Sequence, residues 1–357
     1  MTESCGSSQS TLSVVVVTLN DIELTAACLD GLAKQELLPL EVIVVDNGSE
    51  HDVIGPLRSA FPDVLYESLE SNRGFAGGYN YGLLRARGDL VAIINNDAIP
   101  LPGWTRALVD AAEQDPTVGA VASVVLDGGD PELLDSMGLG LAVDGMARQL
   151  HRGEAVAATP APERVLLPSG SACLFRRTAL ADVGVFDDTF FAYCEDADLG
   201  LRLTWAGWRT VLAADAKVIH KYSATTGRYS SKKVFLVERN HLWLAVKNLP
   251  APFLCALPFT TLWRYWLQLR AVREQSGDLH MFVRQTSPMR LALTLIAAHA
   301  SFAVGLPTAL RQRRAIAGRR RVGTREMTAL LWRHRLSMVA VLSAEVSPSP
   351  PDDNGTA

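Results

Sequence analysis

The chain has 357 residues, 48% of them hydrophobic, which is enough for one large domain with an appendage or for two domains. Its five cysteines have no CxxC spacing, so the sequence offers neither a disulfide framework nor a structural zinc site, and a reducing compartment is favoured. Residues 251–357 contain 14 arginines, no lysine and six acidic residues, a net charge of +8, which leaves −12 on residues 1–250 and −4 in total. This contrast indicates a soluble domain joined to a segment that meets an anionic surface.

Apolar strands and helical segments alternate through the first 126 residues. We expect helices at 22–32, 74–87 and 102–114, and strands at 14–18, 42–45, 64–66, 90–94 and 118–126. The longest β-branched runs have no polar face, as in strands that are covered on both sides. The alternation predicts an α/β fold with a doubly wound, mostly parallel sheet, in which ligands bind beyond the carboxyl ends of the strands.

The patterning after residue 126 is less regular. Residues 127–165 are rich in Gly, Asp, Ala and Pro, which predicts a mobile hairpin or flap. Beyond it we expect strands at 169–176, 208–212 and 217–220, and helices at 178–183, 195–206 and 231–248. Gly207 directly follows the second of these helices, where glycine commonly ends a helix.

Two strongly apolar segments, 253–266 and 291–310, are each followed by arginines. The second has 20 residues without a formal charge, close to the length that spans a bilayer, but basic residues flank both of its ends. We therefore expect helices that lie at a membrane interface or insert partly into it.

These patterns divide the chain into a disordered N-terminus (1–10), a catalytic domain (11–250), a helical, membrane-associated extension (251–345) and a disordered tail (346–357). The first ten residues have no basic segment before an apolar run, so we expect no secretory signal peptide.

Single polar residues follow two of the predicted strands. Asp97, after the strand at 90–94, is either a ligand of a hard divalent cation or a turn carboxylate that caps the helix at 102–114. His220, at the end of the strand at 217–220, is either a second metal ligand or a structural histidine. The residue types alone leave both pairs of alternatives open.

A glycine-rich turn follows Asn72 and Arg73 and opens a helix. Backbone N–H groups at such a helix start attract phosphate, and the alternative is an ordinary turn. The glycines at 74, 77 and 78 do not form GxGxxG, and no GK[ST] follows them. This spacing argues against a dinucleotide fingerprint, a P-loop and hence a dehydrogenase.

Three acids, Glu195, Asp196 and Asp198, lie within four positions at the start of a predicted helix. Neighbouring carboxylates repel one another, although a helix N-terminus favours negative charge. The functional interpretation is a general base beside a substrate hydroxyl, and the structural alternative is a solvated cap group. Asp198 is expected to pair with Arg202 one turn along the helix.

Together these motifs resemble the family 2 inverting glycosyltransferases, which have the GT-A fold, and within that family the rhamnosyltransferase-like branch of bacterial cell-envelope enzymes. The resemblance covers about residues 11–250. It depends on His220 and on six motifs at 13–20, 42–49, 72–74, 95–97, 170–177 and 195–198.

The resemblance implies roles for single residues. Asp97 matches the last residue of the family's DxD motif, which binds a metal ion, and His220 matches a histidine that completes the metal site. Asp196, with Glu195 beside it, matches the general base. Asn95 replaces the first acid of DxD, which removes one charge from this site. The donor-binding positions are Thr18, Asn20, Asp46, Asn72, Arg73, Asn96 and Gly170.

The implied reaction is inverting transfer of a sugar from a dTDP- or UDP-sugar to a hydroxyl of a glycan or polyprenyl-linked acceptor, with Mg²⁺ or Mn²⁺ on the donor diphosphate. Rhamnose is the branch's commonest sugar. We expect a cytoplasmic protein, peripheral at the inner face of the plasma membrane, with no nucleic-acid partner. The alternatives are a catalytically inactive nucleotide-sugar-binding protein and a sugar nucleotidyltransferase. The latter would need a glycine-rich, basic loop after the first strand, which residues 19–22 do not provide.

Overall fold

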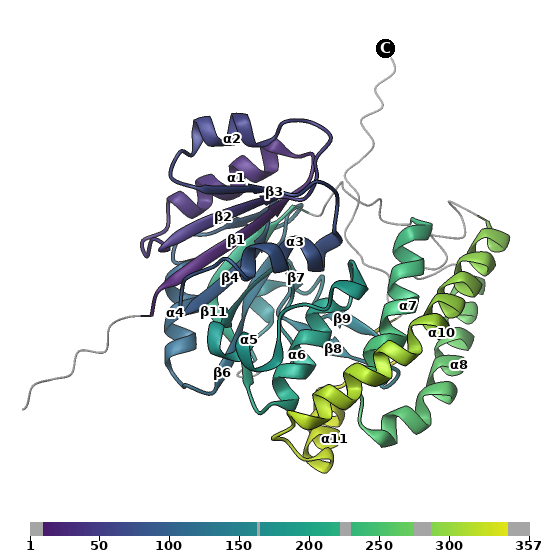
Figure 1. Ribbon diagram of the computed structural model, residues 1–357. Helices are drawn as coiled ribbons and strands as arrows, with labels where there is room; N and C mark the ends of the chain where they lie inside the picture. Colours follow the sequence, from purple (N-terminus) through teal and green to yellow (C-terminus); the bar gives the residue numbers. More distant parts are fainter. Residues whose placement is uncertain (1–9, 163–164, 222–229, 275–286, 342–357) are drawn as a thin grey trace, which may run out of the picture.

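The computed structural model describes residues 10–162, 165–221, 230–274 and 287–341 (Figure 1). The expected disorder at 1–9 and 346–357 therefore lies outside the described residues. A nine-stranded sheet has the order β3-β2-β1-β4-β10-β6-β11-β5, with β7 paired to β6. The strands are β1 (Leu12–Thr18), β2 (Glu41–Asp46), β3 (Leu65–Ser68), β4 (Leu90–Asn95), β5 (Ala98–Pro100), β6 (Val118–Asp127), β7 (Leu134–Ser136), β10 (Ala172–Arg176) and β11 (Arg209–His220).

Six of these strands run in one direction. β1, β2, β3 and β4 are parallel neighbours, and β6 and β11 are parallel to each other. β10 is antiparallel to both β4 and β6, so those two share a direction although they are not adjacent. The sheet is thus mostly parallel, as predicted, and the carboxyl ends of six strands meet at one edge.

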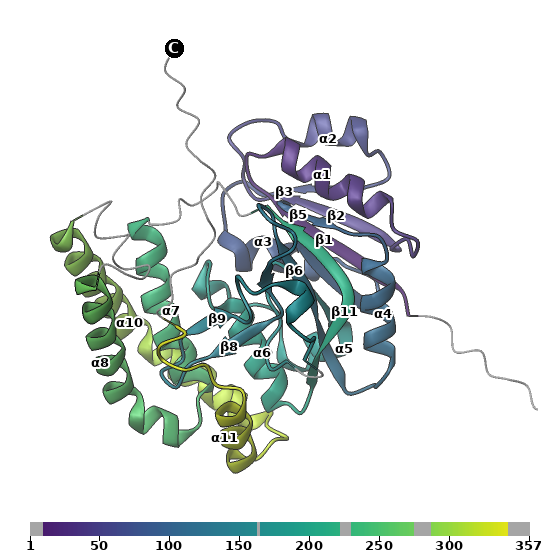
Figure 2. The same ribbon diagram turned by 180° about the vertical axis from the view of Figure 1, so that it is seen from behind.

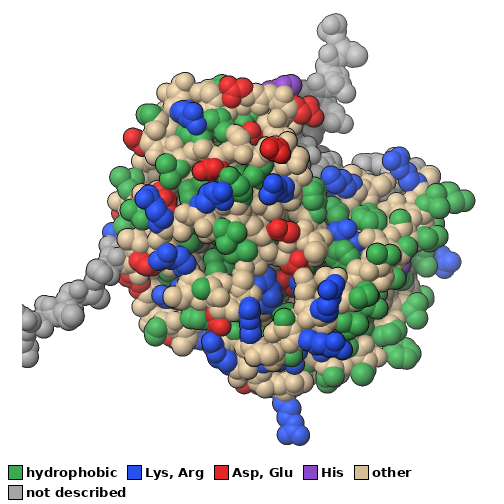
Figure 3. Space-filling model, viewed as in Figure 1, with side chains coloured by type: hydrophobic (Ala, Val, Ile, Leu, Met, Phe, Trp, Pro, Cys, Tyr) green, Lys and Arg blue, Asp and Glu red, His purple; other side chains and the backbone are tan. Residues whose placement is uncertain are grey.

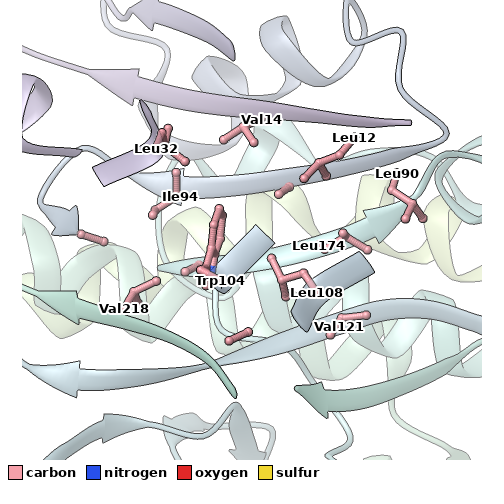
Figure 4. Packing of buried hydrophobic residues seen from close by; sticks show 14 of the residues in the cluster. Leu12, Val14, Leu32, Leu90, Ile94, Trp104, Leu108, Val121, Leu174 and Val218 are labelled. Atoms are coloured by element: carbon pink, nitrogen blue, oxygen red, sulfur yellow. The ribbon is translucent and has the colours of Figure 1, made fainter. Parts of the chain in front are cut away.

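Helices cover both faces of the sheet. They are α1 (Ile22–Ala33), α2 (Ile54–Ala60), α3 (Gly74–Leu83), α4 (Trp104–Glu113), α5 (Arg177–Val183) and α6 (Glu195–Trp205). One apolar cluster fills the face covered by α1 and α4, where Val14, Ile94 and Trp104 pack together (Figure 4). A second cluster fills the opposite face and includes Val15 and Phe175. Both sides of the β-branched strands are buried, which is why they lack a polar face.

Some boundaries differ from the sequence-based predictions. The strands expected at 208–212 and 217–220 form one strand, β11, with a break in register between Ala213 and Lys217. α2 and β5 were not predicted, because seven and three residues are too short to show a clear period. The helix expected to end at 87 ends at Leu83.

Residues 127–162 contain β7, the hairpin β8 (Leu139–Leu141) with β9 (Ala147–Gln149), and a short 3₁₀ turn, η1 (Val156–Ala158). A hairpin is therefore present, as expected. Its apolar side chains are buried, including Leu139, Leu141 and Met146. The expectation of a mobile flap is wrong for the β8–β9 hairpin, because the hairpin packs against the C-terminal helices.

Four further helices lie among the described residues after the sheet: α7 (Ser231–Asn248), α8 (Ala251–Arg273), α10 (Pro288–Gly318) and α11 (Thr324–Arg333). α8 and α10 lie side by side, away from the strands, in both views (Figures 1 and 2). Both are longer than the apolar segments predicted, and they continue through Pro258 and Pro307. α11 was not predicted.

Candidate active site

The predicted donor-side residues lie at the carboxyl edge of the sheet. Thr18 at the end of β1 pairs with Asp46 at the end of β2, and Val17 pairs with Asn95 at the end of β4. Register thus brings together motifs that are almost 80 positions apart in the sequence. Ligands of parallel α/β sheets bind at this edge.

Hydrogen bonds among the loops fix the first of these positions. The hydroxyl of Thr18 is buried and lies 2.8 Å from the Thr25 hydroxyl. Asp46 Oδ1 accepts hydrogen bonds from the backbone N–H and the hydroxyl of Ser49. Asn20 is exposed and has a positive φ of 59°, which asparagine tolerates better than most residues.

Asn47 organises the turn that contains Asn72 and Arg73. Its Oδ1 accepts from the backbone N–H of Arg73 at 3.0 Å, and its Nδ2 donates to the carbonyl of Gly74 at 3.0 Å. Asn72 Oδ1 in turn accepts from Gly74 N–H at 2.7 Å. The side chains of Asn72 and Arg73 remain exposed at the start of α3. Nothing in the sequence indicated this role of Asn47.

Gly74 joins this donor-side turn to the segment before the acidic cluster. It has a φ of +71°, and a Cβ at this position would lie 2.2 Å from the carbonyl oxygen of Phe191. The N–H of Ala76 donates to the same oxygen at 3.2 Å. Only glycine fits here, because both the backbone conformation and the close approach exclude a side chain.

The asparagine pair after β4 is held from both sides. Asn95 Oδ1 accepts from the Tyr79 hydroxyl at 3.0 Å, and Asn95 N–H donates to the carbonyl of Ser171 at 2.9 Å. Asn96 Nδ2 donates to Thr25 Oγ1 at 3.3 Å, within the same cluster as Thr18. Asn95 thus has a structural partner where the family motif has its first acid.

Asp97 is 4% exposed and is followed directly by β5. The N-cap of α4 is Gly103, so the alternative that Asp97 caps this helix is excluded. β5 pairs with the end of β11, which brings His220 beside it, and His220 Nε2 lies 3.2 Å from Asp97 Oδ1.

The other ring nitrogen of His220, Nδ1, lies 2.9 Å from Asp135 Oδ2. Burial disfavours the imidazolium, but the hydrogen bonds and charges of Asp135 and Asp97 outweigh it and raise the His220 pKa to about 10. Asp135 was missed because it lies 85 residues away in the hairpin region.

Asp97 and His220 have the geometry of two ligands of one divalent cation. Two cis ligands at about 2.1 Å from an octahedral ion lie about 3 Å apart, which fits the 3.2 Å between Asp97 Oδ1 and His220 Nε2. A carboxylate on the second ring nitrogen is the usual support of a metal-bound histidine. Within the described ranges no group of three or more His, Cys, Asp or Glu side chains is arranged to hold a metal ion. These two ligands therefore suit an ion that completes its shell on substrate phosphates.

Asp196 lies in the first turn of α6, beside the turn at Gly170. Its Oδ2 accepts from Gly170 N–H at 3.0 Å and its Oδ1 accepts from its neighbour's N–H, that of Ala197, at 2.8 Å. A Cβ on Gly170 would lie 2.9 Å from Phe75 and 3.2 Å from Asp196 Oδ2. Burial raises the Asp196 pKa, and these two N–H groups oppose that rise.

Glu195 is more deeply buried than Asp196. It is 5% exposed, and its Oε2 has no hydrogen-bond partner among the described residues. Burial and the negative charge of Asp196 raise its pKa well above the usual value. The two carboxyl groups thus differ: the Glu195 pKa is raised well above its usual value, and Asp196 is less buried.

Three residues before α6 have left-handed backbone conformations without being glycine: Phe191, Tyr193 and Cys194, with φ between 65° and 71°. Asn240 of α7 holds this segment, since its Nδ2 lies 2.8–2.9 Å from the carbonyl oxygens of Phe190, Ala192 and Tyr193. Such conformations cost about 1–3 kcal/mol each and persist where surrounding structure fixes them. Sequence reasoning missed Asn240 as the residue that positions the acidic cluster.

Asp198 is structural, as predicted. It accepts from Arg202 Nε at 2.8 Å and from Asn248 Nδ2 at 2.8 Å, and Lys247 Nζ lies 2.8 Å from it. Burial opposes its ionisation, but Lys247 and Arg202 outweigh burial and lower its pKa to about 2. A cavity of about 450 Å³ lies near this cluster, between α6 and α10, rather than at Asp97 or Asp196.

The polar residues that were predicted from separate motifs thus meet at the edge of one sheet, on a fold that is the GT-A fold of nucleotide-sugar-dependent glycosyltransferases. Residues 13–184 match the model of glycosyl transferase family 2. The chain is a glycosyltransferase, and this part of it is similar to that family.

Relatives support this assignment. The N-acetylglucosaminyl-diphospho-decaprenol L-rhamnosyltransferase of Mycobacterium tuberculosis is 29% identical over 265 residues, which cover 65% of this chain and 86% of that protein. The pre-mycofactocin glycosyltransferase of Mycobacterium tuberculosis is 29% identical over 201 residues, 55% of this chain and 40% of the relative.

Solved structures show the fold. The crystal structure of GalNAc-T7 with UDP, GalNAc and Mn²⁺ matches with a TM-score of 0.58 at 14% identity, and the match covers 70% of this chain but only 50% of that chain. The structure of Staphylococcus aureus TarS residues 1–349 has a TM-score of 0.50 at 16% identity and covers 85% and 91% of the two chains.

Proposed function

We propose that this chain transfers a sugar from a nucleotide-diphosphate donor to an acceptor hydroxyl with inversion, with Asp196 as the general base. One observation carries the proposal. Gly170 donates its N–H to Asp196, while the carbonyl of the next residue, Ser171, accepts from Asn95 in the Asn95–Asp97 turn. This short link supports placing the base and the donor-side turn on two walls of one cleft.

Asp196 would accept the proton of the acceptor hydroxyl as its oxygen bonds to the anomeric carbon and the bond to the nucleoside diphosphate breaks. Burial makes the carboxylate a stronger base, and two N–H groups keep it ionised. Burial and the negative charge of Asp196 raise the pKa of Glu195, which disfavours a second negative charge at the site. A single displacement inverts the anomeric centre and needs no covalent nucleophile.

The donor diphosphate would be bound by a divalent cation on Asp97 and His220, with Arg73 exposed at the start of α3 nearby along the same edge. When bound, the cation neutralises charge that develops on the leaving diphosphate. An imidazole ligand favours Mn²⁺ over Mg²⁺, because magnesium prefers oxygen donors. Donor binding is further assigned to Thr18, Asn20, Asp46, Asn72, Asn96 and Gly170.

The substrates are proposed from the relatives. The name of the mycobacterial relative supports rhamnose, from dTDP-rhamnose, as the first sugar to test, with UDP-sugars next, and a polyprenyl-diphosphate-linked glycan as the acceptor. Such an acceptor is held in a membrane, so we place the protein in the cytoplasm at the inner face of the plasma membrane. Residues 11–250 would form the catalytic domain and 251–345 its membrane-associated extension.

Nucleotide release from dTDP-rhamnose and a panel of UDP-sugars tests this function, with purified protein, Mn²⁺ and a short polyprenyl-diphosphate-linked N-acetylglucosamine as acceptor. The expected result is acceptor-dependent release that Asp196→Asn abolishes while nucleotide binding survives. The product's anomeric configuration, read by NMR, should be opposite to that of the donor. Binding of the donor without any release by the wild type would instead favour the inactive sugar-binding protein. Formation of a nucleotide sugar from a sugar phosphate would favour the nucleotidyltransferase.

A further inference from the structure

The outer side of α8 and α10 is apolar and uncovered. On α8 the exposed side chains include Leu262 (66%), Trp266 (56%) and Leu269 (62%), and on α10 they include Ile296 (66%) and Val304 (84%). These residues recur at helical spacing, so each helix presents one continuous stripe. Hydrophobic side chains gather over α8 and α10 at the right of the space-filling view (Figure 3). We call these two stripes the docking face.

α10 is long and apolar enough to cross a membrane by length and composition, and only 6% of its most apolar window is buried. Its inner side is nevertheless attached to α7. The Trp243 indole donates to the carbonyl of Phe302, and its ring fills the space where a Cβ on Gly305 would lie at 2.3 Å. Arg313 donates to the carbonyls of Val246 and Leu249, both at 2.8 Å. A spanning helix would have to leave these partners.

α8 is attached through buried charge. Arg264 is 1% exposed and donates from Nε to Asp144 at 2.7 Å and from Nη2 to Glu238 of α7 at 2.8 Å. Tyr265 OH also donates to Glu238 and lies 3.3 Å from His299 Nε2 of α10. Insertion of α8 into a bilayer would leave these charges unpaired, which is strongly unfavourable. Both helices are thus fixed on the protein with one side free.

The charged residues around the docking face indicate which kind of partner binds there. Neither α8 nor α10 contains an Asp or Glu residue. Exposed arginines lie at both ends of the stripes: Arg273, Arg290, Arg311 and Arg314. Arg270, also exposed, is paired with Glu274 just beyond α8 at 2.8 Å. Apolar side chains with interfacial tryptophans and a predominantly basic rim match an anionic lipid surface. A second copy of the chain would bring an identical positive rim against this one and is therefore disfavoured.

We infer that the docking face lies on an anionic membrane leaflet, with α8 and α10 parallel to its plane and neither helix spanning it. The inference deepens the proposed function, because it names the surface at which a lipid-linked acceptor would be met. Its test needs no sugar transfer, so it can fail independently of the proposed reaction.

Co-sedimentation with vesicles tests whether the docking face binds an anionic membrane. Wild-type protein should bind vesicles of 30% phosphatidylglycerol in phosphatidylcholine and bind pure phosphatidylcholine far more weakly, and binding should fall with salt. The variant L262E/I296E should lose at least about tenfold in vesicle affinity, because it places charge in the interface. The matched control L38E/L40E, on a loop before β2 where both leucines are also exposed, should bind as the wild type does.

A second measurement distinguishes a helix α10 that lies on the membrane surface from one that spans the membrane. Ala300 is exposed in the middle of the α10 stripe, so A300C, with Cys5 and Cys255 replaced by serine, can carry an environment-sensitive fluorophore. Lipids with a nitroxide near the headgroup should quench it more than lipids with a nitroxide at the chain end. The inference is overturned by stronger quenching from the deep probe, by equal binding of L262E/I296E and wild type, or by a dimer in light scattering that L262E/I296E dissociates.

Discussion

The side-chain amide of Asn240 on α7 donates to the carbonyl oxygen of Tyr193 at 2.9 Å, two residues before the acidic pair at the start of α6. The same amide lies 2.8 Å from the carbonyl of Ala192. This contact makes α7 the support of a backbone segment that would otherwise relax from its left-handed conformation. The position of the proposed base therefore depends on a helix outside the sheet.

Asn240→Ala should lower kcat by about 10²-fold, because small displacements of a catalytic group have effects of that size, and should leave the KM for donor nearly unchanged. Steady-state kinetics with thermal denaturation checks this expectation. Asn248→Ala is the matched control, since Asn248 is also buried on α7 but bonds to Asp198 and not to residues 190–193. Equal kcat losses in the two variants would show that Asn240 acts only through stability.

Asp196→Asn should lower kcat by about 10²–10⁴-fold, the usual contribution of a general base. Glu195→Gln should retain most activity, because Gln resembles the protonated Glu195 that burial and Asp196 favour. Single-turnover rates at saturating donor, with nucleotide affinity from calorimetry, separate the two variants. The opposite order of activities would reverse the assignment of the base.

Gly74→Ala should lower both stability and transfer, because it combines a positive φ with a 2.2 Å approach of the new Cβ to the Phe191 carbonyl. Gly103→Ala has the same backbone penalty, of about 1 kcal/mol, but has nothing within 4 Å of its Cβ. Denaturant unfolding and transfer assays on both variants isolate the contact. The proposed link between the donor turn and residue 191 predicts that only Gly74→Ala affects kcat strongly.

Asp198 should contribute to stability in a pH-dependent way. Its pKa falls from 3.8 in the unfolded chain to about 2 in the folded protein, so its stabilising effect of about 2 kcal/mol is present above pH 4 and is lost as the pH falls toward 2. The difference in unfolding free energy between the wild type and Asp198→Asn, measured by urea unfolding from pH 6 to pH 2.5, should shrink over this range. A difference that stays constant with pH would contradict the assignment.

Asp97→Ala should weaken the binding of Mn²⁺ and of the donor in the presence of Mn²⁺. The expected loss in donor affinity is at least about tenfold, because the ion would lose one of two protein ligands. Donor titrations with Mn²⁺, with Mg²⁺ and with EDTA check this. Identical donor affinities of wild type and variant in all three conditions would remove Asp97 from the metal site.

Much of the architecture follows from local sequence. The runs Val14–Val16 and Leu90–Ile94 are buried on both faces of a mostly parallel sheet, and their composition alone indicates this. Asp97 and Asp196 were also identifiable as candidate residues, because each lies within two residues of the end or the start of a regular element. Polar residues at strand ends are positioned by the chain's own topology, so their neighbourhood is implied by strand order.

Contacts between distant segments could not be read in this way. The pairing of His220 with Asp135 depends on how the β7 region packs beside β6, and the support of residues 190–193 by Asn240 depends on where α7 docks. Periodicity reports which side of an element is apolar but not what covers it. For α8 and α10 it indicated apolar helices, and only the tertiary structure decided that one side of each is attached to α7 while the other remains uncovered.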